Sequence, residues 1–283
     1  MKRLDSVLNA FERYLQHHSV KIMRSFHPSF ECAFWEMVQN GGKRFRPALL
    51  FCVVLAHNKE RVKDSFQIAL AIESLHTYSL IHDDLPAMDN ANLRRNHPTL
   101  HTKYSEADAI LCGDGLNTYA FYLIATAHFS DKIRTKLAKS LSFGGLKMVL
   151  GQALDCHFEG QKLKREKVDF IHTNKTAHLI AVSLEMGAII AELPKKEQIQ
   201  LYDFGIKLGL FFQIRDDILD KISESEGKSA NIDEYKNSYV NLLGLKGAQD
   251  ALKSQKVALL DSLEKIDKKI AKNLYFLLNK YFD

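Results

Sequence analysis

The sequence predicts an all-α protein, a single domain over residues 1–283 that forms a bundle of about ten or more helices. Apolar residues recur at helical spacing along most of the chain, and only 14 glycines and 5 prolines interrupt it. No stretch of useful length alternates apolar and polar residues as a half-buried strand does. The hydrophobic fraction of 46% is large enough to fill a sizeable core.

Amphipathic helices are predicted at both ends of the chain. Leu4, Leu8, Phe11 and Leu15 fall at i, i+4, i+7 and i+11, which is one face of a helix. Segment 252–277 continues this pattern, with lysines between its apolar residues. Those apolar residues are Leu252, Leu260, Leu263, Ile266, Ile270, Leu274 and Leu277.

Two further segments are predicted as core helices. Residues 66–81 are apolar on all sides, which places that helix in the middle of the bundle. Residues 177–193 are the most apolar stretch, but His178, Glu185 and Glu192 make it too polar, and it is too short, to span a bilayer. Helix breaks are expected at 41–42, 86–98, 144–145, 160–166, 194 and 223–238.

Charge and cysteine content exclude several classes of protein. The net charge of +5 comes from 39 basic and 34 acidic residues, and aromatic residues do not interleave with a basic block as a nucleic-acid surface requires. The four cysteines are widely spaced without a CxxC pair, and the N-terminus lacks the apolar run of a signal peptide. We therefore expect a soluble, cytoplasmic protein with reduced thiols, no nucleic-acid partner and no stable membrane insertion.

Two aspartate clusters carry the strongest chemical signal, because each follows a strongly apolar helical run. The first is DDLPAMD and the second is DDILD. Their carboxylates are Asp83, Asp84 and Asp89 in the first, and Asp216, Asp217 and Asp220 in the second.

Local geometry can bring the carboxylates of each cluster together. Asp216 and Asp220 are one helical turn apart and project from one face, where Gln213 also lies. In the first cluster Pro86 disrupts the helix, so that Asp89 can curl back toward the preceding aspartates.

Carboxylates that end buried helices are costly unless a cation neutralises them. Mg²⁺ fits best, since it uses a few carboxylates together with water and substrate phosphate oxygens. A solvated Asp-rich turn would explain either cluster alone, but two clusters favour the metal. No twelve-residue loop with a closing glutamate supports calcium.

Basic motifs accompany the clusters. Arginine forks and lysine ammonium groups bind phosphate oxygens, so the alternation of basic and acidic motifs on apolar helices predicts a site for diphosphates with apolar tails. Solvated surface residues are the alternative for each cation taken singly. The candidates are Lys43, Arg44 and Arg46 in GGKRFRP, Arg94 and Arg95 in LRRNHPT, Lys175 with Thr176 in NKT, and Lys228 and Lys236.

The ordered set GGKRFRP, HTYSLIHDDLPAMD, LRRNHPT, GQALD, NKT and FFQIRDDILD, over about residues 41–247, closely resembles the trans-polyprenyl diphosphate synthases, and within them the bacterial farnesyl type. The resemblance implies a deep apolar cavity, a homodimer, and both aspartate clusters holding Mg²⁺, with three ions per active site. It also implies that isopentenyl diphosphate binds to Lys43, Arg46, His76 and Arg95. Contacts to the allylic diphosphate are implied for Arg94, Lys175, Thr176, Gln213, Lys228 and Lys236, of which Arg94, Lys175, Thr176 and Gln213 take part in catalysis, and Gln152 and Asp155 face the same cavity.

The expected reaction is ionisation of an allylic diphosphate (dimethylallyl or geranyl), attack by isopentenyl diphosphate, and loss of a proton. Tyr78, about 7–8 Å below Asp83 at helical rise, is expected to limit the product to farnesyl diphosphate. It could instead be an ordinary core aromatic, with a geranylgeranyl or other short-chain product. A class I terpene cyclase or a non-catalytic synthase subunit are further alternatives, but DDILD and the complete acidic and basic sets favour elongation.

Several positions depart from the family pattern without removing an expected ligand. Asn96 and Ala177 stand where glycine is usual, Val240 where proline is frequent, and Asn90 and Ala91 where acidic residues are common. The loop between Asp220 and Lys228 is also shorter than the family pattern.

Overall fold

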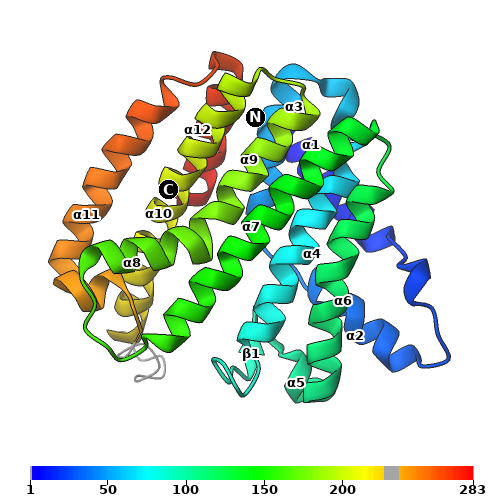
Figure 1. Cartoon of the computed structure of the whole chain (residues 1–283), viewed down its shortest axis with the longest axis horizontal. Helices are drawn as coiled ribbons and strands as arrows, with labels where there is room; N and C mark the ends of the chain where they lie inside the picture. The colour runs from blue at the N-terminus through cyan, green and yellow to red at the C-terminus, as the bar shows by residue number, and fades with distance from the viewer. Residues whose placement is uncertain (1, 226–235, 283) are drawn as a thin grey trace. The chain divides into compact units, whose positions relative to one another are not determined.

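The computed structural model describes residues 2–225 and 236–282 as an almost entirely helical protein (Figure 1). The predicted all-α class is confirmed. The sole sheet in the described part of the chain is a hairpin of two strands, each two residues long. The helices are α1 (Lys2–His17), α2 (Pro28–Gln39), α3 (Phe45–His57), α4 (Ser65–Asp83), α5 (Leu100–Lys103), α6 (Glu106–Ala125), α7 (Asp131–His157), α8 (Arg165–His172), α9 (His178–Ile190), α10 (Lys195–Ser225), α11 (Tyr239–Leu263) and α12 (Lys268–Phe282). The short elements are η1 (Lys21–Met23), η2 (Lys59–Val62) and η3 (Thr173–Ala177), with strands β1 (Leu93–Arg94) and β2 (His97–Pro98).

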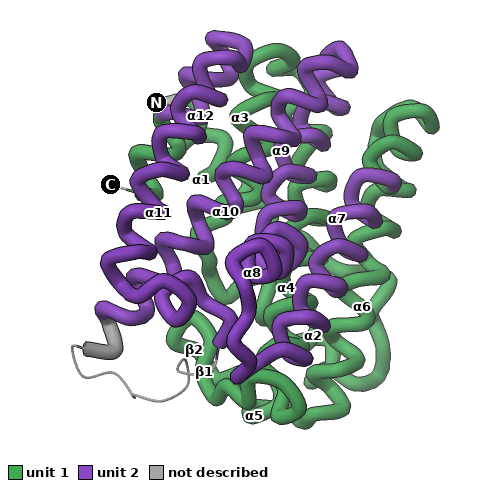
Figure 2. The backbone as a smooth tube through the Cα atoms, turned by 60° about the vertical axis from the view of Figure 1, so that its left-hand side comes forward, with its two compact units in different colours: residues 1–138, 276–283 green, residues 139–275 purple. Residues whose placement is uncertain are grey.

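The chain divides into two compact units, drawn in separate colours in Figure 2. Unit 1 comprises residues 1–138 and 276–283, and unit 2 comprises residues 139–275. The expectation of a single domain stays a prediction.

Unit 1 is built around α4. This helix packs most extensively on α6, beside which it runs in Figure 1, and also contacts α1, α2 and α3. Buried residues occupy every side of α4, as its sequence predicts. Leu4, Phe11 and Leu15 of α1 are buried as well, which confirms the N-terminal amphipathic face.

Unit 2 is built around α9 and α10. The predicted core helix at 177–193 is confirmed, because α9 is buried along almost its whole length and packs on α10, which in turn packs on α11. Of the C-terminal stripe, Leu263, Ile266, Ile270 and Leu274 are buried, whereas Leu260 is exposed. No helix of the described residues has the length and apolar character needed to cross a bilayer.

One predicted helix break is wrong. Gly144 and Gly145 lie inside α7, because Gly144 serves close packing rather than chain reversal. A Cβ atom on Gly144 would lie 2.8 Å from Cγ2 of Val182 on α9. Glycine here lets two helices approach, and its modest cost in helix propensity is tolerated.

Capping explains where several helices begin. The Ser105 hydroxyl accepts a hydrogen bond from the Asp108 N–H (3.0 Å) at the start of α6, and Ser238 does the same for the Asn241 N–H (3.1 Å) at the start of α11. These bonds satisfy backbone donors that a helix N-terminus leaves without partners. The second cap matters for the site, because it adjoins Tyr239, whose N–H binds Asp217 of the second acidic motif.

Candidate active site

The first acidic motif lies at the C-terminal end of α4, in unit 1. The helix ends at Asp83, and the chain then turns so that the Asp89 N–H donates to the Asp83 carbonyl (2.8 Å). The fold-back predicted from Pro86 is therefore present, and it returns Asp89 to the end of the helix.

Asp84 is held by an arginine of the adjacent hairpin. Arg94 Nε and Nη2 both donate to Asp84 Oδ1, at 2.9 Å and 2.5 Å. Asp84 is 2% exposed, and its Oδ2 is buried without a hydrogen-bond partner. Burial raises the pKa of Asp84 although Arg94 opposes the shift. Such a carboxylate oxygen calls for a further positive or donating group.

The hairpin itself depends on an unusual turn. Arg95 and Asn96, the two residues between the strand pairs Leu93–Pro98 and Arg94–His97, both have positive φ. Type I′ turns require this conformation at both central positions, and asparagine tolerates it better than most residues. Asn96 thus replaces the family's usual glycine without removing the turn.

A cationic cluster surrounds His76 in the same unit. Arg46 Nη1 lies 3.1 Å from His76 Nε2, and because arginine can only donate, the histidine accepts and is neutral. Burial and the charges of Arg46 and Arg95, with those of Arg94 and Arg44, hold the pKa of His76 well below its usual value. Arg95 Nη1 also donates to the Gly41 carbonyl (2.8 Å), beside exposed Lys43. The four residues expected to bind isopentenyl diphosphate therefore belong to one region of unit 1.

Arg44 differs from its two basic neighbours because it points into the protein. Its guanidinium contacts Glu12 (3.0 Å), Glu73 (2.9 Å) and the Val38 carbonyl (2.8 Å), and the residue is 6% exposed. The sequence motif alone did not distinguish this structural cation from Lys43 and Arg46.

Tyr78 lies on α4 one turn before His82. Its ring is 8% exposed and meets the His82 ring edge-on at a centroid distance of 5.6 Å. His82 Nε2 donates to the Ile110 carbonyl on α6 (3.1 Å). Tyr78 is thus fixed beneath the first acidic motif on the same helix.

The second acidic motif lies on α10, in unit 2. Asp217 is 9% exposed, and both of its oxygens accept hydrogen bonds: Oδ1 from Gln213 Nε2 (2.9 Å) and Oδ2 from the Tyr239 N–H (2.7 Å). Gln213 Oε1 in turn accepts from the Thr176 hydroxyl (2.9 Å). Burial raises the pKa of Asp217 even though these donors oppose the shift.

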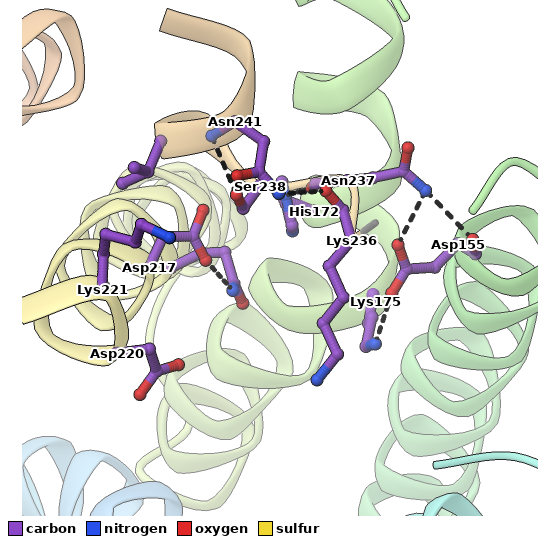
Figure 3. Close-up of a pocket in the computed structure, with 12 residues that line it drawn as sticks. Asp155, His172, Lys175, Asp217, Asp220, Lys221, Lys236, Asn237, Ser238 and Asn241 are labelled. Carbon is purple, nitrogen blue, oxygen red and sulfur yellow. Dashed lines mark hydrogen bonds and ion pairs between the residues drawn. The ribbon is translucent and has the colours of Figure 1, made fainter. Parts of the chain in front are cut away.

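A pocket of unit 2 is lined by three of the six residues assigned to the allylic substrate, Lys175, Gln213 and Lys236 (Figure 3). Lys175 Nζ lies 2.6 Å from Asp155 Oδ2 within it. Burial alone would raise the pKa of Asp155, but Lys175 and Asn237 outweigh it and the pKa is lowered. The pocket is lined by Asp155, His172, Lys175, Gln213, Asp217, Asp220, Lys221, Lys236, Asn237, Ser238, Val240 and Asn241.

Not every expected residue joins this pocket. Gln152 donates instead to Cys156 Sγ (3.5 Å), one turn further along α7. Lys228 lies outside the described residues. Lys236 does line the pocket, and Figure 3 shows its side chain beside Lys175.

A π-helical turn carries Lys175, which lines the pocket, and Thr176, which binds the pocket residue Gln213. This turn, η3, interrupts the otherwise continuous helix formed by α8 and α9. Gly151 of α7 packs directly on it, because a Cβ there would lie only 2.1 Å from the Lys175 backbone nitrogen. π-Turns inside helices are rare and concentrate at functional sites.

Sequence reasoning missed three buried residues at this site: His172 and Asn237, which line the pocket, and Tyr239, whose N–H binds Asp217. They are 4%, 6% and 1% exposed. One signal was present, since His172 lies one helical turn before Thr176 and is polar where a core residue is expected. The contacts of Asn237 and Tyr239 join distant parts of the chain and have no local signature.

Comparison with known proteins decides the family. The polyprenyl synthetase family model matches residues 27–277. The chain belongs to the polyprenyl synthetase family. It is a prenyltransferase with the all-α architecture that its motifs predict.

Individual relatives agree with this assignment. The chain is 43% identical over 224 residues to a farnesyl diphosphate synthase of Geobacillus stearothermophilus, covering 76% of this chain and 75% of the relative. It is 37% identical to the farnesyl diphosphate synthase of Haemophilus influenzae, covering 94% and 92%. A crystal structure of a Helicobacter pylori geranyltransferase complexed with magnesium and isoprenyl diphosphate superposes with a TM-score of 0.93 at 46% identity, covering 99% of this chain and 97% of that one.

Proposed function

We propose that this prenyltransferase condenses isopentenyl diphosphate with dimethylallyl or geranyl diphosphate, depends on Mg²⁺, and releases farnesyl diphosphate. The observation that carries the proposal is the end of α4, where a buried aspartate held by Arg94 adjoins the folded-back Asp89. A second acidic motif on α10 and a separate cationic cluster around His76 complete the set of groups that two diphosphates require.

The donor set fits magnesium. Asp84 Oδ2 is a buried oxygen without a partner, and the neighbouring groups are hard carboxylate oxygens. Among residues 2–225 and 236–282, no three His, Cys, Asp or Glu side chains are grouped closely enough to enclose an ion unaided. Water and substrate oxygens would complete the coordination, as is usual for this ion.

We assign all six aspartates to the ions, three per active site. They are Asp83, Asp84 and Asp89 in the first motif, and Asp216, Asp217 and Asp220 in the second. Asp84 also accepts hydrogen bonds from Arg94, and Asp217 from Gln213 and the Tyr239 N–H, and these bonds orient the two carboxylates.

The chemistry follows from charge. Bound magnesium supplies Lewis-acid stabilisation of the departing diphosphate. Arg94, Lys175 and the Thr176–Gln213 pair bind the allylic diphosphate and stabilise the negative charge that develops as its C–O bond breaks. Lys236, and Lys228 in the part of the chain that is not described, add positive charge on the same substrate.

A different set of residues binds the second substrate. Lys43, Arg46, Arg95 and neutral His76 bind the diphosphate of isopentenyl diphosphate, whose double bond attacks the allylic carbocation. The new cation loses a proton to the released diphosphate. Apolar helix surfaces exclude water, which would otherwise convert the cation to an alcohol.

Product length rests on Tyr78, which we assign as the floor of the chain-elongation cavity. The ring is buried and fixed against His82 below the first acidic motif. If instead the ring is only a core residue, the product is geranylgeranyl diphosphate or another short chain.

The decisive experiment is incubation of the purified chain with Mg²⁺, isopentenyl diphosphate and geranyl diphosphate, followed by sizing of the products. A fifteen-carbon diphosphate that forms only when isopentenyl diphosphate is present supports the proposal. Cyclic hydrocarbons formed from the allylic substrate alone indicate a terpene cyclase. An inactive chain indicates a non-catalytic subunit.

We also propose a cytoplasmic homodimer. Four cysteines, all within the described residues, form no disulfide, as in a reducing compartment. Phe143, Leu146 and Leu150 of α7 form an exposed apolar stripe at i, i+3 and i+7, which suits burial against a second copy. The molar mass in solution, measured by light scattering, tests the dimer.

A further inference from the structure

Hydrogen bonds hold Asn237 and Tyr239, which follow the second acidic motif in the chain, to three different helices of unit 2. Figure 3 shows Asn237 beside His172 and Asp155. The Asn237 carbonyl accepts from His172 Nε2 of α8 (2.6 Å). The Asn237 side-chain amide donates to the Asp155 carbonyl and to Asp155 Oδ1 on α7 (3.0 Å and 3.1 Å). The Tyr239 N–H donates to Asp217 Oδ2 on α10 (2.7 Å). We call His172, Asn237 and Tyr239 the latch.

The latch is buried and polar. The rings of His172 and Tyr239 stack at a centroid distance of 5.3 Å and an interplanar angle of 25°. His172 Nδ1 is buried without a hydrogen-bond partner, a cost that an apolar side chain would avoid. Burial lowers the pKa of His172, so the imidazole is neutral and carries its proton on Nε2, where the Asn237 carbonyl requires a donor.

Two chains of hydrogen bonds run from the latch to the π-turn η3. In the first, Asn237 contacts Asp155, and Asp155 pairs with Lys175 (2.6 Å). In the second, Tyr239 contacts Asp217, which is bound to Gln213, and Gln213 is bound to Thr176. The chains therefore end on adjacent residues, the lysine and threonine that we assign to the allylic diphosphate.

We propose that His172 is a positioning residue that, through Asn237 and Tyr239, orients Lys175, Thr176 and Asp217 for the allylic diphosphate and its metal. The inference rests on the proposed function and adds residues to it. The effect of His172 should be limited to the allylic substrate. The residues assigned to isopentenyl diphosphate belong to unit 1 and take no part in these two chains of bonds; they are Lys43, Arg46, His76 and Arg95.

The test compares steady-state kinetics of the wild type with three variants, using Mg²⁺, isopentenyl diphosphate and geranyl diphosphate. His172→Leu removes the donor and leaves the Asn237 carbonyl unpaired. Partners that orient metal and substrate ligands contribute about 10- to 100-fold to affinity or activity. We therefore expect KM for geranyl diphosphate, or the half-saturating Mg²⁺ concentration, to rise by about 10- to 100-fold. KM for isopentenyl diphosphate should stay unchanged.

Two conservative changes separate positioning from folding. His172→Gln keeps an N–H donor and should recover part of the loss. Asn237→Ala keeps the carbonyl that His172 binds but removes the amide on Asp155, so it should raise the same constants even if His172→Leu does not fold. The matched control is His178→Leu, which removes a histidine hydrogen bond to Tyr202 in the same unit that belongs to neither chain of bonds. It should leave both KM values unchanged.

Equal rises in KM for both substrates would overturn the positioning role, and so would unchanged values of both KM for geranyl diphosphate and the half-saturating Mg²⁺ concentration. Calorimetric binding of inorganic diphosphate with Mg²⁺ separates this outcome from failure of the proposed function. If the wild type makes no prenyl product but binds diphosphate, and His172→Leu weakens that binding, the proposed reaction is wrong and the positioning role of His172 is supported. If His172→Leu binds diphosphate as tightly as the wild type, the positioning role is wrong.

Discussion

Gly151 offers a sharp test of how the π-turn presents Lys175. Its Cα faces η3, and a Cβ there would lie 2.1 Å from the Lys175 nitrogen, 2.5 Å from its Cα and 2.7 Å from the Asn174 carbonyl carbon. All three are backbone atoms, so no side-chain rotation relieves the contact. The substitution Gly151→Ala must push α7 and η3 apart.

The size of this displacement determines the expected losses of stability and of catalytic rate. Non-bonded carbon atoms prefer separations of about 3.5–4.0 Å, so the backbones must separate by more than about 1 Å. Overpacking of this kind costs about 1–3 kcal/mol of stability. A misplacement of about 1 Å in a catalytic group costs about 100-fold in rate. Because Lys175 Nζ is only 2.6 Å from Asp155 on the same α7, the pair should also lengthen.

The assay measures kcat with geranyl diphosphate, together with Tm by calorimetry. Gly151→Ala should lower kcat by about 100-fold while the protein stays folded. The control is Gly247→Ala on α11 in the same unit, where a Cβ would lie 2.9 Å from Leu243 Cβ of the same helix and near no atom of α7 or η3, and its kcat should be unchanged. A normal kcat for Gly151→Ala would refute the argument that backbone contact sets the position of Lys175.

Three further predictions concern other parts of the chain. Tyr78→Ala should extend the product beyond fifteen carbons in the sizing assay, and an unchanged product would remove Tyr78 as the cavity floor. Arg44→Leu should lower the free energy of unfolding, measured by urea denaturation, by about 3–5 kcal/mol, because it leaves the Glu73 carboxylate buried without its partner. A loss below about 1 kcal/mol, which is typical of an exposed ion pair, would contradict the buried network. Burial, with Lys147 nearby, lowers the pKa of His178 to about 4. The neutral imidazole therefore contributes fully to the free energy of unfolding above pH 6.5, and this contribution is lost as the pH falls toward 4. His178→Leu should remove a pH dependence of at most about 1.4 kcal/mol per pH unit in that range, and identical slopes in mutant and wild type would exclude His178 as its source.

The sequence predicted the local features of the fold well. The buried character of α4, the core position of α9 and the turn that returns Asp89 to Asp83 all follow from residues close together in the chain. Gly144 misled because a helix break and a helix–helix close approach use the same residue type, and only the position of Val182 distinguishes them.

Long-range polar contacts could not be predicted in the same way. The burial of Arg44 depends on Glu12 and Glu73, which are 32 and 29 residues away in the chain. His172 and Asn237 are 65 residues apart. Periodicity identifies which face of a helix is buried, but it does not identify the partner that satisfies a polar group on that face.

We propose above that the acidic motif on α4 supports metal-dependent diphosphate chemistry. The turnover of Asp83→Ala with Mg²⁺, isopentenyl diphosphate and geranyl diphosphate tests this most directly. The matched control is Asp131→Ala, which removes an aspartate that is 92% exposed and forms a surface pair with Arg134. We expect Asp83→Ala to abolish turnover and Asp131→Ala to keep the wild-type rate. Near-normal turnover of Asp83→Ala would contradict the assignment of this motif to the metal.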